Sequence, residues 1–175
     1  MTRDELGKSI YNCAHLTGDF LLRSGQRSTE YFDKYQFESD PKILKAIGEQ
    51  LKDKIPAGTE VLGALEMGGI PIATAISFAT GIPVVFVRKE AKSYGTCKFA
   101  EGPDVSGKKL CIVEDVITTG GQVKISTADL RKEGALISDV VCVIDRSNGD
   151  SPKITESDLK LHSLFTMNEL KALIS

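Results

Sequence analysis

The architecture of this 175-residue chain follows from one stretch, Leu110-Cys111-Ile112-Val113-Glu114-Asp115-Val116-Ile117-Thr118-Thr119-Gly120-Gly121. Its apolar beginning, 110–113, predicts a strand buried in a parallel sheet, and two carboxylates follow where we expect this strand to end. A Thr-Thr-Gly-Gly turn and a polar helix, 122–133, come next. Threonine hydroxyls, glycine N–H groups and a helix N-terminus together make an anion site of phosphate size. Glu114 and Asp115 are then expected to bind sugar hydroxyls or Mg²⁺, because carboxylates repel phosphate.

The same stretch has a simpler interpretation, in which Asp115 caps a helix and the glycines form an ordinary turn. We favour ligand binding, because two acids, two hydroxyls and two glycines within 114–121 exceed what a turn requires. The spacing matches neither a P-loop nor a dinucleotide-binding motif. It resembles the phosphoribosyl-diphosphate (PRPP) signature of the type I phosphoribosyltransferases. This resemblance implies a ribose phosphate site made of Glu114, Asp115, Val116, Ile117, Thr118, Thr119, Gly120, Gly121 and Gln122.

The composition is that of a soluble globular chain, with 41% hydrophobic residues, 26% charged residues and a net charge of −2. This charge gives no reason to expect a nucleic acid or an anionic membrane as partner. No apolar run approaches the length of a membrane span, and the first five residues show no secretory signal. The cysteines are far apart and indicate reduced thiols, so we expect a cytoplasmic protein. They are Cys13, Cys97, Cys111 and Cys142.

Strands and helices alternate along the chain, which predicts an α/β fold with a mainly parallel, doubly wound sheet flanked by helices. The predicted strands are 61–65, 83–87, 109–113, 139–144 and 161–165, and the predicted helices are 3–16, 41–54, 71–80, 122–133 and 167–174. Two short apolar stretches, 20–22 and 31–32, indicate a hairpin. We interpret residues 1–175 as a single phosphoribosyltransferase domain. Its PRPP-binding core is 58–150, and a small hood is formed or covered by 1–57 and the C-terminal tail.

A long connection, 88–108, separates the second and third of these strands and contains no helix of normal length. Connections of this length in compact domains are usually functional lids or disordered segments. This one begins with three cations, Arg88, Lys89 and Lys92. A solvated cluster on a surface hairpin would also explain them. We favour a long flexible loop that acts as a cationic lid, because the connection begins at the sheet edge that carries the anion turn.

A second turn of small residues contains Gly68 and Gly69, which let the backbone approach a ligand and point N–H groups at it. Together with the acidic turn and the lid, it indicates a ligand with two separate anionic ends. PRPP has a 5′-phosphate at one end and a pyrophosphate at the other, and we assign the pyrophosphate to Gly68, Gly69 and the lid. The chemistry that follows is displacement of pyrophosphate by a base nitrogen. The lid cations and Mg²⁺ would neutralise the leaving group while the closed lid excludes water.

Further segments resemble the orotate phosphoribosyltransferases: 20–25 with Tyr31-Phe32-Asp33, then 87–92 with Gly95-Thr96, and finally Asp145-Arg146. The resemblance implies transfer of the phosphoribosyl group of PRPP to orotate, which gives orotidine 5′-monophosphate in pyrimidine synthesis. It also implies dependence on Mg²⁺ and a homodimer whose loop reaches into the neighbouring subunit's site. The implied catalytic residues are Arg88, Lys89, Lys92 and Asp115, and the implied PRPP contacts add Tyr94, Gly68 and Gly69 to the turn. The implied orotate contacts are Thr118, Arg146, Tyr31 and Phe32, and Mg²⁺ is held through PRPP with Glu114 and Asp115 as further candidate ligands.

Elementary chemistry favours Arg146 independently, because a guanidinium fork suits the carboxylate of orotate. The alternative is a surface arginine paired with Asp145 or Asp150, which would contribute little.

Two residues depart from the family pattern. Tyr94 stands where the loop normally carries a histidine, and its phenol can donate a hydrogen bond to pyrophosphate but cannot act as a cation. Gly68 stands where many bacterial members have a lysine, so we expect the backbone to supply that contact. Two alternatives therefore stay open, a phosphoribosyltransferase for another base, such as a purine, and a PRPP-sensing regulator on the same fold. Replacing Lys89 by alanine is expected to lower turnover far more than the same change at Lys171 on the tail.

Overall fold

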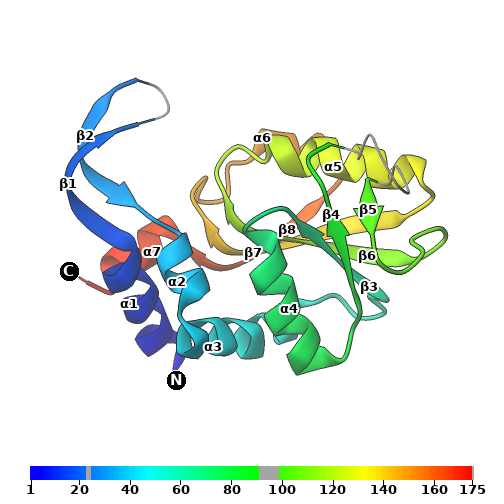
Figure 1. Cartoon of the computed structure of the whole chain (residues 1–175), viewed down its shortest axis with the longest axis horizontal. Coiled ribbons are helices and arrows are strands. Elements are labelled where there is room, and N and C mark those ends of the chain that lie inside the picture. The colour runs from blue at the N-terminus through cyan, green and yellow to red at the C-terminus, as the bar shows by residue number, and fades with distance from the viewer. Residues whose placement is uncertain (23–24, 91–98, 175) are drawn as a thin grey trace.

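The computed structural model describes residues 1–22, 25–90 and 99–174, in which the main sheet has six strands (Figure 1). These are β3 (Val61–Leu65), β4 (Val84–Val87), β5 (Ala100–Glu101), β6 (Lys109–Ile117), β7 (Leu136–Asp145) and β8 (Lys160–Thr166). Their order across the sheet is β5-β4-β3-β6-β7-β8, and β5 pairs antiparallel with β4 while the other pairs are parallel. The prediction of a mainly parallel, doubly wound sheet is confirmed.

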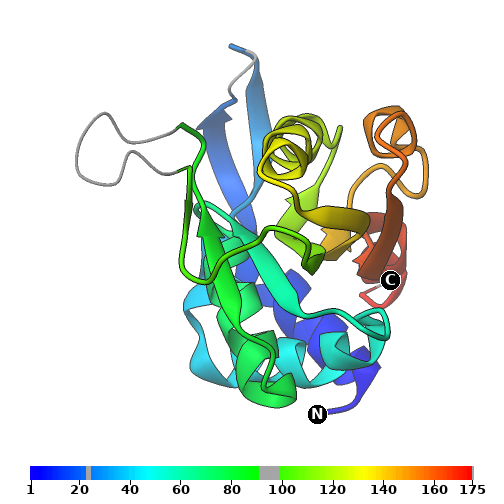
Figure 2. The same ribbon diagram turned by 90° about the vertical axis from the view of Figure 1, so that its right-hand side faces the viewer.

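Helices cover both faces of this sheet. They are α1 (Arg3–Ala14), α2 (Tyr35–Ser39), α3 (Pro41–Leu51), α4 (Gly69–Thr80), α5 (Gly121–Lys132), α6 (Pro152–Thr155) and α7 (Met167–Ala172), and a 3₁₀ turn, Lys52–Lys54, follows α3. Figure 2 shows α5 and α6 above the sheet and α4 below it. One apolar core joins α1, α3 and α4 to the sheet, and Ile10, Ile47 and Ile76 are fully buried in it. A second core joins α5 and α6 to the other face through Leu130 and Ile154.

Strand β6 is longer than its sequence pattern indicated. We expected it to end at Val113, with the carboxylates beyond it, but it continues to Ile117 and pairs with β7 as far as Asp145. The prediction was wrong because Val116 and Ile117 are β-branched and apolar and continue the ladder past the acids. Glu114 and Asp115 therefore belong to the strand, which fixes their backbone rigidly.

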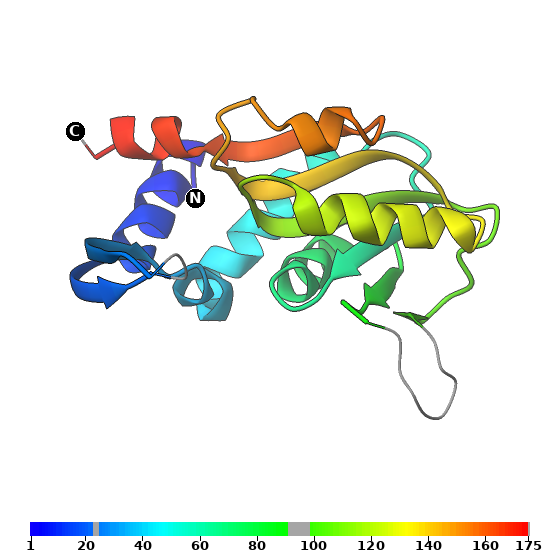
Figure 3. The same cartoon turned by 90° about the horizontal axis from the view of Figure 1, so that it is seen from above.

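The hairpin and three helices stand at the carboxyl ends of the strands (Figures 1 and 3). The hairpin consists of β1 (His15–Leu21) and β2 (Arg27–Phe32), and it confirms the predicted pairing of two N-terminal stretches. We use the name hood for α1, β1, β2, α2 and α7. Strands β6, β7 and β8 point toward the hood, so any ligand at their carboxyl ends would lie between the hood and the sheet.

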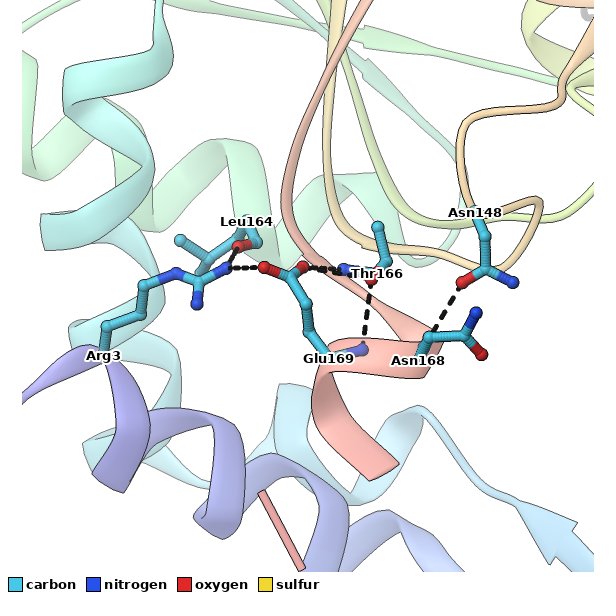
Figure 4. Close-up of polar contacts among 6 residues, drawn as sticks. All are labelled: Arg3, Asn148, Leu164, Thr166, Asn168 and Glu169. Atoms are coloured by element: carbon cyan, nitrogen blue, oxygen red, sulfur yellow. Dashed lines mark hydrogen bonds and ion pairs between the residues drawn. The ribbon is translucent and has the colours of Figure 1, made fainter. Parts of the chain in front are cut away.

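Figure 4 shows how the two chain ends are joined in the hood. The guanidinium of Arg3 on α1 donates to the Leu164 carbonyl at 2.9 Å and pairs with Glu169 on α7 at 2.8 Å. It also lies over the Phe165 ring, 4.4 Å from its centroid. Thr166 and Glu169 form a capping box at the start of α7. The tail is thus an integral part of the hood.

Three elements were not predicted, namely α2, β5 and α6, because each has five residues or fewer and too little periodicity to be seen in the sequence. Cys13, Cys111 and Cys142 are free thiols, and Cys97 lies outside the described residues. In the described ranges, no helix is long and apolar enough to cross a membrane.

Candidate active site

The point where the strand order changes direction lies between β3 and β6. The chain passes from β3 through α4 to β4 on one side, and later places β6 on the other side of β3. Adjacent loops diverge at such a point and leave a crevice at the carboxyl ends of the strands, where ligands bind in open α/β sheets. The turn after β3, the beginning of the predicted lid after β4, and the carboxyl end of β6 are therefore neighbours.

The turn after β3 and the beginning of the lid are tied together by two hydrogen bonds. The N–H of Glu66 donates to the Val87 carbonyl at 2.9 Å, and the N–H of Lys89 donates to Glu66 Oε1 at 2.7 Å. Lys89 itself is exposed, while Arg88 pairs with Glu101 at 3.6 Å. The backbone that carries these two cations, which are predicted to bind PRPP, thus lies beside the glycine turn. Lys92 and Tyr94 lie outside the described residues.

Gly68 and Gly69 allow their turn to rest directly on β6. A Cβ on Gly69 would lie 2.3 Å from the Val113 carbonyl oxygen, and one on Gly68 would lie 1.7 Å from Asp115 Oδ2. A side chain at position 69 would have to move the backbone of β6, and one at position 68 would have to displace the Asp115 side chain. The turn that begins with the cis Glu66–Met67 peptide therefore brings its backbone against the acidic motif.

Asp115 is engaged on both oxygens. Its carboxylate is 1% exposed, Oδ1 accepts the Val116 N–H at 2.5 Å, and Oδ2 forms an ion pair with Lys34 from the hood. A third acid, Glu38 on α2, is also buried beside it. Sequence analysis identified neither Lys34 nor Glu38, because nothing in the pattern around α2 marks them and only the tertiary fold brings them to β6.

Burial decides the charge state of this cluster. Desolvation, together with a hydrogen bond to Asp115, raises the pKa of Glu38 to about 9. Desolvation and the Asp115 charge likewise raise the pKa of Glu114 to about 8. For Asp115, burial is outweighed by Glu38 and Lys34, so its pKa lies below the ordinary value. Burial therefore favours the ionised form of Asp115 and the neutral form of Glu38 and Glu114, and a protonated Glu114 can both donate to and accept from a sugar hydroxyl.

The predicted phosphate turn leads into α5 as expected. Residues 118–119 are exposed, and Gly120, with φ +71°, has the left-handed conformation that reverses the chain before the helix. The segment at α6 adds two side chains that the sequence did not reveal. Lys153 Nζ lies 3.3 Å from where a Cβ on Gly121 would stand. Ser151 Oγ lies 3.2 Å from the corresponding point on Gly120 and is buried, with no hydrogen-bond partner among the described residues.

A cavity of about 290 Å³ lies between the hairpin and α7, and three of the predicted orotate contacts, Tyr31, Phe32 and Arg146, line it. The fourth, Thr118, follows Ile117, whose carbonyl accepts the N–H of Arg146 at 2.8 Å. The structure thus brings the four predicted base contacts together. The other residues that line the 290 Å³ cavity are Tyr11, His15, Leu22, Ser28, Glu30, Met167 and Lys171. Lys171 is consequently unsuitable as a neutral comparison for the lid lysine, because it shares this cavity.

The residues do not form a cage for a resident metal ion. No group of three or more His, Cys, Asp or Glu side chains in the described ranges is arranged to hold a metal. Asp115 has both oxygens occupied by protein partners, and Glu114 favours its protonated form.

Comparisons with known proteins agree with this geometry. Residues 35–163 match the family model of the phosphoribosyl transferase domain. An orotate phosphoribosyltransferase from a Nocardioides species is 50% identical over 98% of this chain and 97% of its own length. The orotate phosphoribosyltransferase of Mycobacterium tuberculosis H37Rv, solved with Fe(III) dicitrate, superimposes with a TM-score of 0.84 at 29% identity over 96% of this chain and 98% of its own. The same enzyme solved with PRPP gives a TM-score of 0.82 at 26% identity, with 97% and 98% of the two chains covered.

The sheet, its crevice and these similarities lead to one assignment. The chain belongs to the phosphoribosyltransferase family and, within it, to the orotate phosphoribosyltransferases.

Proposed function

We propose that this enzyme transfers the 5-phosphoribosyl group from PRPP to orotate, giving orotidine 5′-monophosphate and pyrophosphate in pyrimidine synthesis. The observation that carries the proposal is the bond between the Arg146 N–H and the Ile117 carbonyl, 2.8 Å long. It joins the end of the PRPP motif to the cavity that contains an arginine and two aromatic rings. A planar, carboxylated base and a phosphorylated sugar would thereby meet at one sheet edge.

In this proposal each part of the crevice has one task. The N–H groups of residues 118–122 and the α5 N-terminus bind the 5′-phosphate, and Glu114 binds a ribose hydroxyl. Gly68 and Gly69 point backbone donors at the diphosphate. Arg146 holds the orotate carboxylate in a position that aims the base nitrogen at the anomeric carbon.

The reaction forms the bond from the base nitrogen to the anomeric carbon as the bond to pyrophosphate breaks. The electron pair of that bond leaves with pyrophosphate, and the proton of the base nitrogen is released to solvent. Positive charge grows on the ribose ring, which the ionised carboxylate of Asp115 would stabilise. Negative charge grows on pyrophosphate, beside Arg88 and Lys89. We infer that Mg²⁺ enters bound to PRPP, where it would neutralise part of the diphosphate charge.

We also propose a cytoplasmic homodimer, in which the lid loop of one subunit serves the site of the other. Its support is an apolar surface on α3 and α4, where Phe78 is 89% exposed beside Pro41, Leu44, Pro71 and Ala75. Helix α4 is apolar nearly all round, which is typical of a helix covered on every side. Light scattering should give twice the chain mass, and Phe78→Glu should give a monomer. A wild-type monomer would remove this part of the proposal. We also propose that the chain divides into a PRPP-binding core, 58–150, and a hood.

The function is tested by mixing the protein with Mg²⁺, PRPP and orotate and following the loss of orotate absorbance. We expect turnover with orotate and none with hypoxanthine. Turnover with hypoxanthine alone would favour a purine-type enzyme, and PRPP binding without turnover of any base would favour a regulator. Either result would refute the proposal.

A further inference from the structure

Lys34 is the most prominent group at this sheet edge to which the proposed mechanism gives no role. It immediately precedes α2 in the hood, and its carbonyl accepts the N–H of Glu38 at 3.3 Å. Its side chain reaches from the hood to the sheet and forms the ion pair with Asp115. The ammonium also lies 5.3 Å from the centroid of the Tyr35 ring. Lys34 is thus held in place by its neighbours in the fold, unlike the freely moving head of a surface lysine.

The ion pair places this ammonium beside the glycine turn. Asp115 Oδ2, the oxygen that pairs with Lys34, lies 1.7 Å from where a Cβ on Gly68 would stand. The carboxylate of Asp115 therefore fills the space of a side chain at position 68, and the Lys34 ammonium is in direct contact with that carboxylate. This is the turn to which the diphosphate of PRPP is assigned.

The two partners differ in their access to solvent. The Lys34 side chain is 33% exposed, whereas that of Asp115 is 1% exposed. Solvent, and a ligand dissolved in it, can therefore reach the cation of this pair but not its anion. An ammonium has three N–H donors, so pairing with Asp115 leaves Lys34 able to donate to a second anion.

The balance of charges within the cluster does not by itself explain why the Lys34 side chain is more exposed than that of Asp115. Burial disfavours the Lys34 ammonium, but the hydrogen bond and the charge of Asp115 outweigh this and hold its pKa above the ordinary value. Since Glu38 and Glu114 favour their neutral forms, Lys34 and Asp115 balance each other. A lysine that served only this balance could be as buried as its partner.

We propose that Lys34 is a further catalytic residue, whose ammonium, held by Asp115, contacts the diphosphate of PRPP over the Gly68-Gly69 turn and stabilises the departing pyrophosphate. This inference rests on the proposed function. Lys34 keeps its proton throughout and supplies only charge and hydrogen bonds. It would act from the hood, whereas Arg88 and Lys89 belong to the lid, so the leaving group would meet cations from both segments.

The test compares Lys34→Met with Lys34→Arg and with Lys8→Met, an exposed lysine of α1 that lies outside the crevice. The probe is inorganic pyrophosphate with Mg²⁺, whose affinity is measured by calorimetry without orotate and by inhibition against PRPP. Loss of one charge-assisted contact should weaken pyrophosphate binding about tenfold in Lys34→Met. The KM for orotate should not change, Lys34→Arg should recover most of the affinity, and Lys8→Met should match the wild type. Wild-type pyrophosphate affinity in a folded Lys34→Met protein would overturn the proposal.

The same comparison is repeated in a second parent protein, because Lys34→Met alone leaves a buried carboxylate without its cation and destabilises the fold. Asp115→Asn removes that carboxylate, so Lys34→Met can be added to it without an unpaired charge. The double variant should bind pyrophosphate about tenfold more weakly than Asp115→Asn alone, and equal affinities would overturn the role of Lys34. Absence of orotate turnover in the wild type would instead remove the proposed function, so the two failures are distinguishable.

Discussion

Replacing Arg146 by methionine tests base recognition, since it removes the guanidinium and keeps most of the side-chain length. Arg146 lines the 290 Å³ cavity together with Tyr31 and Phe32. A charge-assisted hydrogen-bonded pair of this kind contributes about 1.5–3 kcal/mol. Arg146 is exposed, so solvent and salt screen the interaction and the lower part of that range applies. A loss of about 1.5–2 kcal/mol corresponds to a decrease of roughly 10- to 30-fold in kcat/KM for orotate.

The assay measures steady-state turnover at saturating PRPP with orotate and, separately, with uracil, which has the same ring without the carboxylate. We expect Arg146→Met to lower kcat/KM for orotate and to leave the low activity with uracil nearly unchanged. The KM for PRPP should stay at the wild-type value, because the change keeps the backbone N–H that bonds the Ile117 carbonyl and removes only a guanidinium on the base cavity. Equal losses for orotate and uracil would refute a carboxylate contact, and so would an unchanged kcat/KM for orotate.

Three other changes test the lid, the acidic cluster and the glycine turn. Lys89→Ala should lower kcat at least about tenfold, because it removes a cation that stabilises the leaving group. The control, Lys132→Ala at an exposed ion pair on α5, should leave kcat unchanged. Equal turnover in the two variants would remove the lid from the mechanism. Between its ordinary value of 4.5 and about 9, Glu38 binds a proton only in the folded state, so wild-type stability falls as pH rises through that window. In urea unfolding, Glu38→Gln should not lose stability in this way. Its free energy of unfolding relative to that of the wild type should therefore rise by at least about 1 kcal/mol from pH 5.5 to pH 8.5. If the stabilities of the two proteins changed with pH in the same way, the protonated state of Glu38 would be contradicted. Gly69→Ala should lower the free energy of unfolding by about 1–3 kcal/mol in the same measurement, because its Cβ would lie 2.3 Å from the Val113 carbonyl oxygen. A variant as stable as the wild type would show that the turn does not rest on β6.

Much of the fold follows from local sequence signals. The buried strands lie near their predicted positions because their apolar runs are continuous. Helices α1 and α7 begin at the predicted residues, each after a capping box. The end of β6 was misjudged because an acidic pair looks like the end of a strand, whereas its pairing with β7 continues past it. Elements as short as α2 and α6 depend on tertiary packing and leave too little pattern to be read.

The residues of the site likewise fall into those that local sequence predicts and those that only the tertiary fold brings together. The turns after β3 and β6 could be predicted because each carries its chemistry in consecutive residues. Lys34, Glu38 and Lys171 could not, because each reaches the crevice from the hood, where the neighbouring sequence gives no indication of it. The protonation of Glu114 was equally out of reach, because it depends on burial beside a second acid.

The most direct test of the account is a crystal structure of this chain with PRPP and Mg²⁺. We expect the 5′-phosphate on residues 118–122, the ribose over Glu114, and the diphosphate over Gly68-Gly69 with Lys34 Nζ within about 3 Å of one of its oxygens. PRPP bound away from the carboxyl ends of β3 and β6, or a diphosphate that leaves the glycine turn empty, would contradict the account.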